Sequence, residues 1–519
     1  MTAPVDVPMS ALLDQPFNLI ADLLRRHAVV QPHHPALRHG QRVLDYAALD
    51  VLIDRAASAL QRDGLQLGDA LAICASASIE YAVIFLAGLR AGVTVVPLAP
   101  SSTPESLVAM TADAGARLLF VDAAVAHELT PIAAQIAARQ IALDGTAFQD
   151  WLAAPGTRPA AVVIEPDQPF NIIYSSGTTG APKGIVQSHG MRWLHVCRAT
   201  LNGYGPEAVT LISTPLYSNT TLVSFFPTLA LGGTVVLMAK FEAGAYLALA
   251  AEHRVTHAML VPVQYQRLMA RPDFGDYDLS SFHMKFSTSA PFGAVLKADI
   301  LTRWPGGLTE YYGMTEGGGT CVLAAHDFPN KLHTVGCPAP EHDIRLIDEE
   351  GQEVAPGETG EVVGHSGAMM NAYYNQPAKT AEAEWYDPTG KRFIRTGDVG
   401  RFDEDGFLIL MDRKKDMVIS GGFNIYPSDL EAVLCQHPDV SETAVVGVAS
   451  TRWGETPVAF VVLRSGAGTT ADTLLEWANE RLGKMQRLAA LRVVDSLPRS
   501  AIGKVLKREL RDNFQPPLA

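Results

Sequence analysis

Hydrophobic positions along the first half of the chain follow two alternating spacings. Apolar residues recur at helical intervals over Tyr46–Asp63 and Ile79–Ala91, whereas Ala70–Cys74 and Val93–Leu98 are short, nearly continuous apolar runs. Alternation of such runs with helical segments predicts a parallel sheet with crossover helices. The same alternation continues over Glu105–Ala112, Leu118–Val121, Ala208–Ser213, Gly233–Met238 and Ala258–Pro262. Most of the chain is therefore predicted to form a large α/β body of mixed or parallel sheets.

The pattern changes twice in the second half of the chain. Gly351–Gly364 and Phe402–Leu410 combine glycine turns with short alternating runs, which is typical of a small antiparallel β-subdomain. The charged cluster Asp412-Arg413-Lys414-Lys415-Asp416 then marks a natural domain boundary. Beyond it we expect helix Ser428–Gln436, strands Ser441–Val448 and Pro457–Leu463, helix Asp472–Arg481 and a last helix from Lys504. We therefore predict an N-terminal domain over residues 1–411, a hinge at 412–416 and a small α+β C-terminal domain over 417–519.

Composition and charge narrow the class of protein. A chain of 519 residues is too long for one hydrophobic core, so two or more domains are expected. Hydrophobic residues at 48% and charged residues at 18% are typical of an ordinary globular protein. The net charge of −14 argues against non-specific binding to nucleic acid, which needs a basic surface.

Cysteine spacing and the longest uncharged run bear on location. The five cysteines are scattered and include no Cys-x-x-Cys pair, which indicates reduced thiols in a cytoplasmic protein and no metal cluster. The N-terminus has no basic region followed by an apolar one, so no secretory signal is expected. The uncharged run between Glu207 and Lys240 contains prolines and the pair Gly232-Gly233, which favours buried strands and helices. We therefore expect no integral membrane association.

One loop carries the most specific chemical signal of the chain. Tyr174-Ser175-Ser176-Gly177-Thr178-Thr179-Gly180-Ala181-Pro182-Lys183-Gly184 directly follows the apolar run Phe170–Ile173. Glycines let backbone N–H groups approach an anion, hydroxyls donate further hydrogen bonds, and the lysine supplies a positive charge. The kinase and GTPase P-loop requires Gly-x-x-x-x-Gly-Lys-Ser/Thr, but Pro182 and Gly184 break that pattern. On composition alone the segment is either a phosphate-binding loop or a solvated surface loop.

The complete string decides between these alternatives. Ser-Ser-Gly-Thr-Thr-Gly-x-Pro-Lys-Gly resembles the signature loop of the adenylate-forming superfamily, which contains acyl-CoA synthetases, peptide-synthetase adenylation domains and beetle luciferases. The resemblance covers nearly the whole chain and implies attack of a carboxylate on the α-phosphorus of ATP, giving acyl-AMP and pyrophosphate. It also implies a mobile loop that holds the triphosphate through Ser175, Ser176, Gly177, Thr178, Thr179, Gly180 and Lys183.

Two further motifs resemble the adenine side of the family's nucleotide site. Tyr311-Tyr312-Gly313-Met314-Thr315-Glu316 resembles Tyr-Gly-x-Thr-Glu, which implies a tyrosine stacked on adenine and Thr315 at the α-phosphate. Glu316 provides the hard oxygen ligand that magnesium prefers. Ser287-Thr288-Ser289-Ala290-Pro291 stands where the family usually has Ser-Gly-Gly-Ala-Pro, so Ser289, Ala290 and Pro291 are the candidate purine wall. Thr288 and Ser289 replace glycines, so a plain turn is the alternative here.

Charged residues near the domain boundary and the C-terminus complete the adenylation set. Arg395-Thr396-Gly397-Asp398 resembles the family's Thr-Gly-Asp, which implies that Asp398 accepts hydrogen bonds from the ribose hydroxyls. Arg413 matches the family's second ribose or phosphate contact, and Lys415 matches the residue about which the family's mobile C-terminal domain rotates. Lys504, in Pro498-Arg499-Ser500-Ala501-Ile502-Gly503-Lys504, resembles the catalytic lysine that reaches the carboxylate and α-phosphate. Solvated surface charges are the alternative interpretation.

A glycine-rich edge and one tryptophan resemble thiol-binding features of CoA ligases. Gly421, Gly422 and Phe423 lie in Ser420-Gly421-Gly422-Phe423-Asn424-Ile425-Tyr426-Pro427, which resembles the edge along which pantetheine lies. Trp453 resembles an aromatic residue that stacks on the CoA adenine in some aryl-CoA ligases, although a structural tryptophan is a serious alternative. Rotation of the small domain between the half-reactions would remove Lys504 as Gly421-Gly422 arrives.

The acyl pocket is the least specific part of the prediction. Its candidate residues are Tyr217, Ser218, Asn219, Gln264, Gly317 and Gly318. Asn219 resembles an asparagine that binds the ortho-hydroxyl of aryl acids, with a capping or turn asparagine as an equal alternative. No aspartate lies in Pro215–Thr221 to bind an α-amino group, which disfavours an amino acid. The acid is therefore expected to be aromatic or a medium- to long-chain fatty acid.

Together the motifs favour an ATP-dependent carboxylic acid–CoA ligase that uses ATP, Mg²⁺ and coenzyme A. Its expected partners are the small carboxylic acid and CoA, with no nucleic acid, and a homodimer is left open. The alternative is a stand-alone aryl-acid adenylating enzyme that loads a carrier protein. Luciferase-like oxidation has no support in the sequence. A non-catalytic nucleotide-binding protein would lack a key residue, yet Lys183, Glu316, Asp398 and Lys504 are all present.

Overall fold

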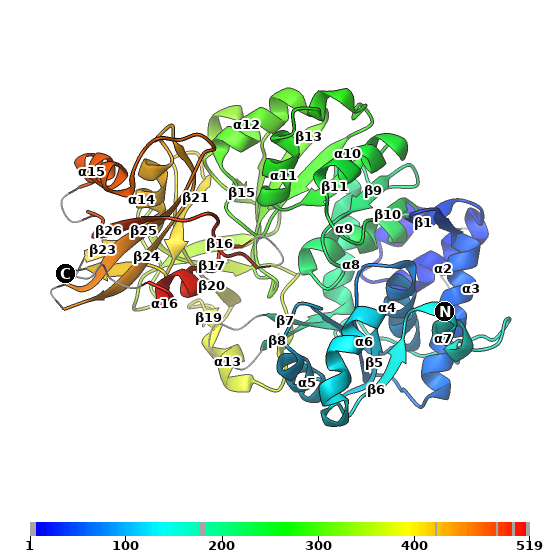
Figure 1. Cartoon of the computed structure of the whole chain (residues 1–519). Coiled ribbons are helices and arrows are strands. Elements are labelled where there is room, and N and C mark those ends of the chain that lie inside the picture. The colour runs from blue at the N-terminus through cyan, green and yellow to red at the C-terminus, as the bar shows by residue number, and fades with distance from the viewer. Residues whose placement is uncertain are drawn as a thin grey trace. The chain divides into compact units, whose positions relative to one another are not determined.

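The chain divides into two compact units (Figure 1). The structure, a computed structural model, describes residues 7–175, 183–420, 423–451, 453–483, 486–500 and 504–514. The first unit comprises Met1–His333, Ala339–Asp343 and Gly364–Ile394, and the second comprises Thr334–Pro338, Ile344–Val363 and Arg395–Ala519. Helices and strands alternate along the first unit, and the smaller second unit is also mixed, which confirms the predicted α/β fold class.

Two large sheets account for most of the first unit. The nine-stranded sheet has the order β15 (Cys337–Pro338), β14 (Cys321–Ala324), β13 (Gly307–Tyr312), β12 (Met284–Ser287), β11 (His257–Leu260), β9 (Val209–Ile212), β10 (Thr234–Leu237), β1 (Pro35–His39) and β2 (Arg42–Asp45). The seven-stranded sheet has the order β18 (Ala372–Tyr373), β8 (Lys183–Ser188), β7 (Pro169–Ser175), β4 (Thr94–Leu98), β3 (Ala70–Cys74), β5 (Ala116–Val121) and β6 (Arg139–Ala142). The central strands β3 and β4 run parallel and are buried at every residue, which explains their continuous apolar runs.

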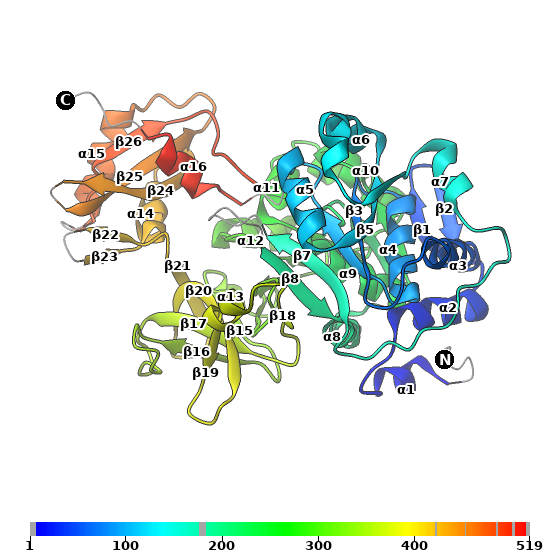
Figure 2. The same cartoon turned by 90° about the horizontal axis from the view of Figure 1, so that it is seen from below.

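Helices pack between the two sheets of the first unit (Figure 2). Helix α4 (Ile79–Ala91) contacts β1 of one sheet and β3 and β4 of the other, and it is buried around almost its whole circumference. The Ser78 hydroxyl accepts a hydrogen bond from the Tyr81 N–H at 3.1 Å, and Gly92 ends the helix with φ 70°. The other helices of this unit are α1 (Met9–Leu13), α2 (Ile20–Val30), α3 (Tyr46–Arg62), α5 (Pro104–Asp113), α6 (Ala123–Leu129), α7 (Gly145–Trp151), α8 (His189–Ala199), α9 (Asn219–Ala230), α10 (Ala243–Glu252), α11 (Pro262–Met269), α12 (Ala294–Arg303) and α13 (Pro377–Glu382).

The uncharged run between Glu207 and Lys240 forms buried elements, as the sequence predicts. Strand β9, helix α9 and strand β10 follow one another there, and α9 packs on β9, β10 and β11. Within the described ranges, none of the helices has both the length and the apolar character that crossing a bilayer requires.

The second half of the chain carries two smaller sheets. One has the order β16 (Asp343–Ile347), β17 (Gly360–His365), β20 (Arg392–Phe402) and β19 (Glu384–Tyr386), with β21 (Leu408–Arg413) also paired to β20. The other has the order β23 (Phe423–Ile425), β22 (Val418–Ser420), β25 (Gly454–Leu463) and β24 (Val440–Ser450), with β26 (Ala490–Val493) paired to β25. Antiparallel pairing in the first of these sheets confirms the predicted β-rich segment.

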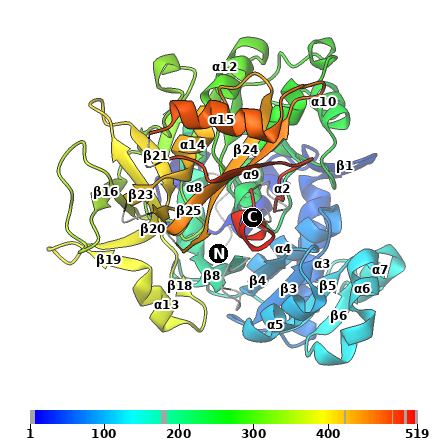
Figure 3. The same cartoon turned by 60° about the vertical axis from the view of Figure 1, so that its left-hand side comes forward.

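The last sheet forms a small α+β layer with its helices. Helices α14 (Pro427–Leu434) and α15 (Ala471–Arg481) lie beside the strands of this sheet (Figure 3). They share one apolar cluster with the strands, which includes Leu430, Leu474 and Val461. The order of these elements matches the sequence prediction. The last helix differs, because α16 spans Lys507–Asp512 and does not begin at Lys504. Lys504 instead precedes the bridge between Val505 and Arg499, so backbone pairing displaces the start of the helix.

Three buried histidines make the stability of the first unit depend on pH. Burial lowers the pKa of His27, His189 and His257 from 6.5 to about 4. The folded chain therefore keeps them neutral, whereas the unfolded chain takes up protons below 6.5. We expect the free energy of unfolding to fall as the pH falls from 6.5 to about 4, measured by denaturant titration. His27→Gln should reduce this slope, because it removes one of the buried groups that takes up a proton on unfolding.

Candidate active site

The predicted phosphate loop connects two adjacent antiparallel strands. Strand β7 ends at Ser175 and β8 begins at Lys183, and these two residues are paired in the register. The predicted triphosphate contacts Ser176, Gly177, Thr178, Thr179 and Gly180 lie outside the described residues. The pairing of β7 with β8 therefore places Ser175, before the loop, next to Lys183, after it.

A tyrosine that the sequence analysis missed links the lysine of this loop to the magnesium candidate. The Lys183 Nζ lies 5.1 Å from the centroid of the Tyr373 ring. The Tyr373 hydroxyl donates a hydrogen bond to Glu316 Oε1 at 2.8 Å. Burial, assisted by the charge of Glu316, raises the pKa of Tyr373, so the phenol keeps its proton. Tyr373 reaches this position because β18 pairs with β8, with Tyr373 opposite Ile185.

Backbone contacts fix Thr315 and Glu316 from two directions. The Gln187 amide Nε2 donates a hydrogen bond to the Thr315 carbonyl at 2.6 Å. The Met370 N–H donates a hydrogen bond to the Glu316 carbonyl at 2.7 Å. Met314 packs against the apolar cluster that contains Ile185, Met370 and Tyr373. The Thr315-Glu316 segment is thus attached both to β8 and to the segment that precedes β18.

Gly317 and Gly318 have a structural reason to be glycine. Their φ angles are 76° and 82°, a region that side chains with a Cβ rarely adopt. A Cβ on Gly317 would overlap the Ala368 carbonyl, and one on Gly318 would lie 2.9 Å from the Gly364 carbonyl oxygen. These glycines, which the sequence analysis places in the acyl pocket, therefore allow close approach of the 364–368 backbone.

The two tyrosines of the adenine motif lie on opposite faces of β13. Tyr311 packs on Phe286 with ring centroids 5.7 Å apart, and burial raises its pKa to about 12. Because side chains alternate along a strand, Tyr312 points to the other face. Gly313 follows and is exposed. Tyr311 thus belongs to the core side, which favours Tyr312 as the adenine contact.

Ser289 adopts a backbone conformation that glycine favours. Its φ is 79°, so this L-residue occupies the left-handed region. Its hydroxyl and that of Thr220, in the first turn of α9, share a hydrogen bond of 2.6 Å. Ala290 is half-buried and Pro291 is exposed. The serine that the sequence marks as a departure therefore has a left-handed backbone and a polar contact with α9.

The acyl-pocket candidates lie around the start of α9 and of α11. Asn219 Oδ1 accepts a hydrogen bond from Gln187 Nε2 at 3.4 Å, and Ser218 precedes it as the helix N-cap residue. Both ends of the Gln264 amide are engaged, because Oε1 accepts from the Val261 N–H at 3.1 Å and Nε2 donates to Ser213 Oγ at 3.3 Å. Burial raises the pKa of Tyr217. Their role in acid binding stays a prediction.

The second unit brings together the other predicted adenylation residues. Arg413 Nε lies 3.0 Å from Asp398 Oδ1, since β20 and β21 pair these residues in register. Burial lowers the pKa of Lys504, and the nearby Arg413 guanidinium acts in the same direction while Asp398 opposes it. Burial also lowers the pKa of Lys415, which lies between β21 and β22. Asp398, Arg413, Lys415 and Lys504 therefore form one electrostatic cluster.

The predicted thiol-binding residues lie along strands β22, β23 and β25. Gly421 and Gly422 lie outside the described residues, and Phe423 is the first residue of β23, opposite Ser420 of β22. Trp453 lies between β24 and β25 with 42% of its surface exposed. Their role in CoA binding stays a prediction.

Glu316 suits a magnesium ion that arrives with a triphosphate. Magnesium at such sites is usually held by one or two carboxylates together with phosphates and waters. No group of three His, Cys, Asp or Glu side chains in the described part of the chain could hold a metal by itself. A single carboxylate such as Glu316 fits a magnesium ion that is bound together with a nucleotide.

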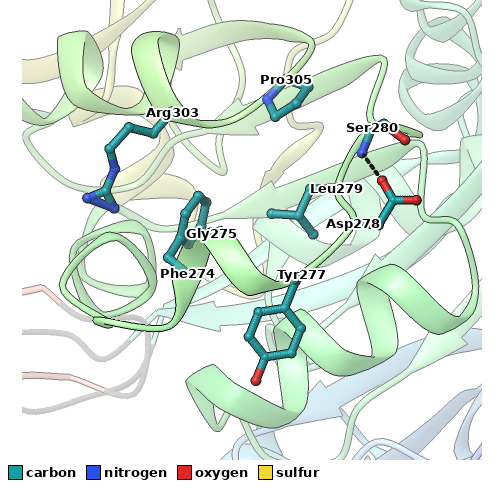
Figure 4. A pocket seen from close by; sticks show the side chains of 8 residues that line it. All are labelled: Phe274, Gly275, Tyr277, Asp278, Leu279, Ser280, Arg303 and Pro305. Atoms are coloured by element: carbon teal, nitrogen blue, oxygen red, sulfur yellow. Dashed lines mark hydrogen bonds between the residues drawn. The ribbon is translucent and has the colours of Figure 1, made fainter.

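A cavity elsewhere in the first unit includes none of these residues. It has a volume of about 240 Å³ and is lined by residues of the 274–280 segment, by Arg303 and by Pro305 (Figure 4). Asp278 accepts a hydrogen bond from the Ser280 N–H at 3.0 Å at its edge. Its lining offers neither the lysine nor the Thr-Glu pair that nucleotide chemistry needs.

Known proteins resemble the chain over almost its full length. It is 34% identical to a feruloyl-CoA synthase from an Amycolatopsis species, over 94% of this chain and 98% of that protein. It is 32% identical to an indoleacetate–CoA ligase from Aromatoleum aromaticum, over 95% and 97%. The crystal structure of ATP-bound MatB from Rhodopseudomonas palustris is 30% identical, with a TM-score of 0.87 over 96% of this chain and 99% of that one.

Family models match both parts of the chain. The model of the AMP-binding enzyme matches residues 24–374, and the model of the AMP-binding enzyme C-terminal domain matches residues 429–504. The first match includes the phosphate loop and the Thr315-Glu316 motif, and the second ends at Lys504. The chain therefore belongs to the AMP-binding enzyme family, as its motifs predict.

Proposed function

We propose that the substrate of this ATP-dependent acid–CoA ligase is an aromatic carboxylic acid. The reaction uses ATP, Mg²⁺ and CoA, as in the family to which the chain belongs. The choice of an aromatic acid is supported by the feruloyl-CoA and indoleacetate–CoA relatives. The single observation that carries the residue assignment is the linked set of Lys183, Tyr373 and Glu316 beside the phosphate loop.

In the first half-reaction a carboxylate oxygen attacks the α-phosphorus, and pyrophosphate leaves with the electrons of the broken P–O bond. We assign the outgoing phosphates to Lys183 and its loop, and the α-phosphate to Thr315. Asp398 and Arg413 hold the ribose, and Lys504 balances negative charge at the carboxylate and α-phosphate. A magnesium ion on Glu316 would neutralise phosphate charge.

In the second half-reaction the CoA sulfur attacks the acyl carbon, and AMP leaves with the mixed-anhydride oxygen. We assign the pantetheine to Gly421, Gly422 and Phe423, and the CoA adenine to Trp453. The segment 412–416, which contains Lys415, is the proposed hinge between the two half-reactions. The 42% exposure of the Trp453 ring supports its part of this assignment.

A second candidate acceptor is a pantetheinylated carrier protein, which Asn219 favours. Its Oδ1 accepts a hydrogen bond from Gln187, and this leaves the Asn219 amide N–H₂ to donate to an oxygen on an aryl acid. Competition between CoA and a pantetheinylated carrier for preformed acyl-AMP separates the two acceptors. Faster transfer to CoA supports the ligase, and faster transfer to the carrier supports the alternative.

Substrate class is tested by a pyrophosphate-release screen over aromatic, short, medium and long-chain acids at equal concentration. We expect hydroxycinnamic or arylacetic acids to give the highest kcat/KM. The physical reason is that a rigid ring in a fitted pocket loses little conformational entropy on binding. A long-chain fatty acid that outperforms every aromatic acid would contradict the proposal.

A cytoplasmic location is part of the same proposal. Cys74, Cys197 and Cys435 carry free thiols. Unpaired thiols are typical of a reducing compartment. Fractionation of cells that express the protein tests this assignment.

A further inference from the structure

A buried arginine without an acidic partner is connected to the Thr315-Glu316 segment through Gln187. Arg192, on α8, is 1% exposed, and no carboxylate among the described residues forms a salt bridge with it. Burial lowers the pKa of Arg192 to about 9. Its Nη2 donates to Asn171 Oδ1 at 3.0 Å and to Gln187 Oε1, and its Nε donates to Asn171 Oδ1 at 3.2 Å. A buried cation whose partners are neutral amides lowers the stability of the folded state, so stability alone does not explain Arg192.

The donors of Arg192 determine how the side-chain amides of Asn171 and Gln187 are oriented in this hydrogen-bond network. A guanidinium has donors and no acceptor, so the oxygens of Asn171 and Gln187 must face Arg192. Asn171 Nδ2 also donates to Gln187 Oε1, at 3.1 Å, which favours the same orientation of Gln187. The Gln187 Nε2 then has to point away, where it donates to the Thr315 carbonyl at 2.6 Å and to Asn219 Oδ1 at 3.4 Å. Arg192 thereby determines which end of the Gln187 amide meets Thr315.

We infer that Gln187 and Arg192 are positioning residues for adenylation: Arg192 orients the Gln187 amide, and that amide holds the Thr315 carbonyl so that Thr315 and Glu316 keep their place beside the phosphate loop. Gln187 lies on β8, the strand that begins with Lys183. The network therefore connects the strand that carries the loop with the motif assigned to the α-phosphate and magnesium. The inference rests on the proposed roles of Thr315 and Glu316.

A purely structural network and a positioning network respond differently to Gln187→Glu. The carboxylate has the same shape and gives Arg192 a buried charge partner, which favours the folded state. It has no donor, however, so its second oxygen faces the Thr315 carbonyl oxygen and repels it. A structural role alone predicts a stable and active variant, whereas a positioning role predicts a stable variant with impaired adenylation.

The test measures denaturant midpoint, ATP–pyrophosphate exchange and thioester formation from supplied acyl-AMP for Gln187→Glu. We expect a midpoint no lower than that of the native protein and a kcat for exchange that falls about tenfold to a hundredfold, as for a small misplacement of a reacting group. Thioester formation from acyl-AMP should be nearly unchanged. A folded variant with native kcat for exchange would overturn the inference.

A matched control is Gln31→Glu. Gln31 Nε2 also donates to a backbone carbonyl, that of Gly232, at 2.8 Å, but it has no part in the proposed site. Loss of this hydrogen bond in Gln31→Glu should leave kcat for exchange unchanged. If Gln187→Glu does not fold, the triple variant Asn171→Leu/Gln187→Leu/Arg192→Met removes the three buried polar side chains of the network together, which is often nearly neutral for stability. That variant should show the same loss of kcat, and native kcat in it would overturn the inference.

The variant Glu316→Gln tests the proposed role of the Thr315-Glu316 motif separately from the positioning role of Gln187 and Arg192. If Glu316→Gln leaves exchange intact, the proposed role of the motif fails. If Glu316→Gln impairs exchange while Gln187→Glu does not, only the positioning role fails. Impairment in both variants supports both assignments.

Discussion

Replacing Lys504 with alanine is expected to lower the rate of acyl-AMP formation by about a hundred- to a thousandfold. The reason is that one half-buried positive charge is removed from the position where we expect negative charge to move during attack on the α-phosphorus. Thioester formation from supplied acyl-AMP should be nearly unchanged, because we assign that step to Gly421, Gly422 and Phe423. An equal loss of rate in both half-reactions would contradict the assignment of acyl-AMP formation to Lys504 and of thioester formation to Gly421, Gly422 and Phe423.

The pH dependence of the first half-reaction reports on the same lysine. Burial lowers the pKa of Lys504 from its ordinary value of 10.5, and Arg413 and Lys415 act in the same direction. The charged ammonium is the active form, so acyl-AMP formation should fall as the pH rises through this lowered pKa. The second half-reaction, started from acyl-AMP, should lack this fall. Arg508→Ala removes an exposed charge from the helix that follows, where Arg508 pairs with Asp512, and should leave both profiles unchanged.

Replacing Glu316 with glutamine is expected to lower acyl-AMP formation by on the order of a hundredfold and to raise the Mg²⁺ concentration needed for half-maximal rate. An amide keeps the shape of the side chain but loses the negative charge that magnesium prefers. ATP–pyrophosphate exchange measured against Mg²⁺ concentration gives both quantities. An unchanged Mg²⁺ requirement would contradict the assignment of Glu316.

Glu384→Gln is a matched control for this change. The Glu384 Oε2 accepts a hydrogen bond from the Tyr386 hydroxyl at 3.0 Å, much as Glu316 accepts one from Tyr373 at 2.8 Å. Glu384 also pairs with Arg392 and has no place in the proposed site. Its replacement should leave the Mg²⁺ requirement unchanged, so a shift in both variants would point to a general effect of lost charge.

Local sequence patterns predicted several elements of the fold. The expected helix Tyr46–Asp63 is α3, Tyr46–Arg62, and the expected strand Ala70–Cys74 is β3. These elements are readable because each buries a face whose spacing repeats within a few residues. The last helix was predicted wrongly at its start, since pairing of Val505 with Arg499 competes with helix formation.

Contacts between distant segments could not be predicted in the same way. Tyr373 reaches Glu316 only because β18 pairs with β8, and nothing in the Tyr373-Tyr374 sequence indicates that pairing. Gln187 likewise meets Thr315 through folding of remote segments. Ser289 shows the opposite case. The sequence marked its departure from glycine, but only the structure shows that Ser289 adopts the left-handed φ of 79° that glycine favours.

The most direct test of the account is the product formed from ATP, Mg²⁺ and an aromatic acid in the presence and absence of CoA. Mass spectrometry of the purified protein's reaction should detect acyl-AMP and pyrophosphate without CoA, and the acyl-CoA thioester with AMP when CoA is added. Thioester formation should require the carboxylate, ATP and CoA together. ADP and phosphate as products, or no acyl-CoA thioester when CoA is added, would contradict the account.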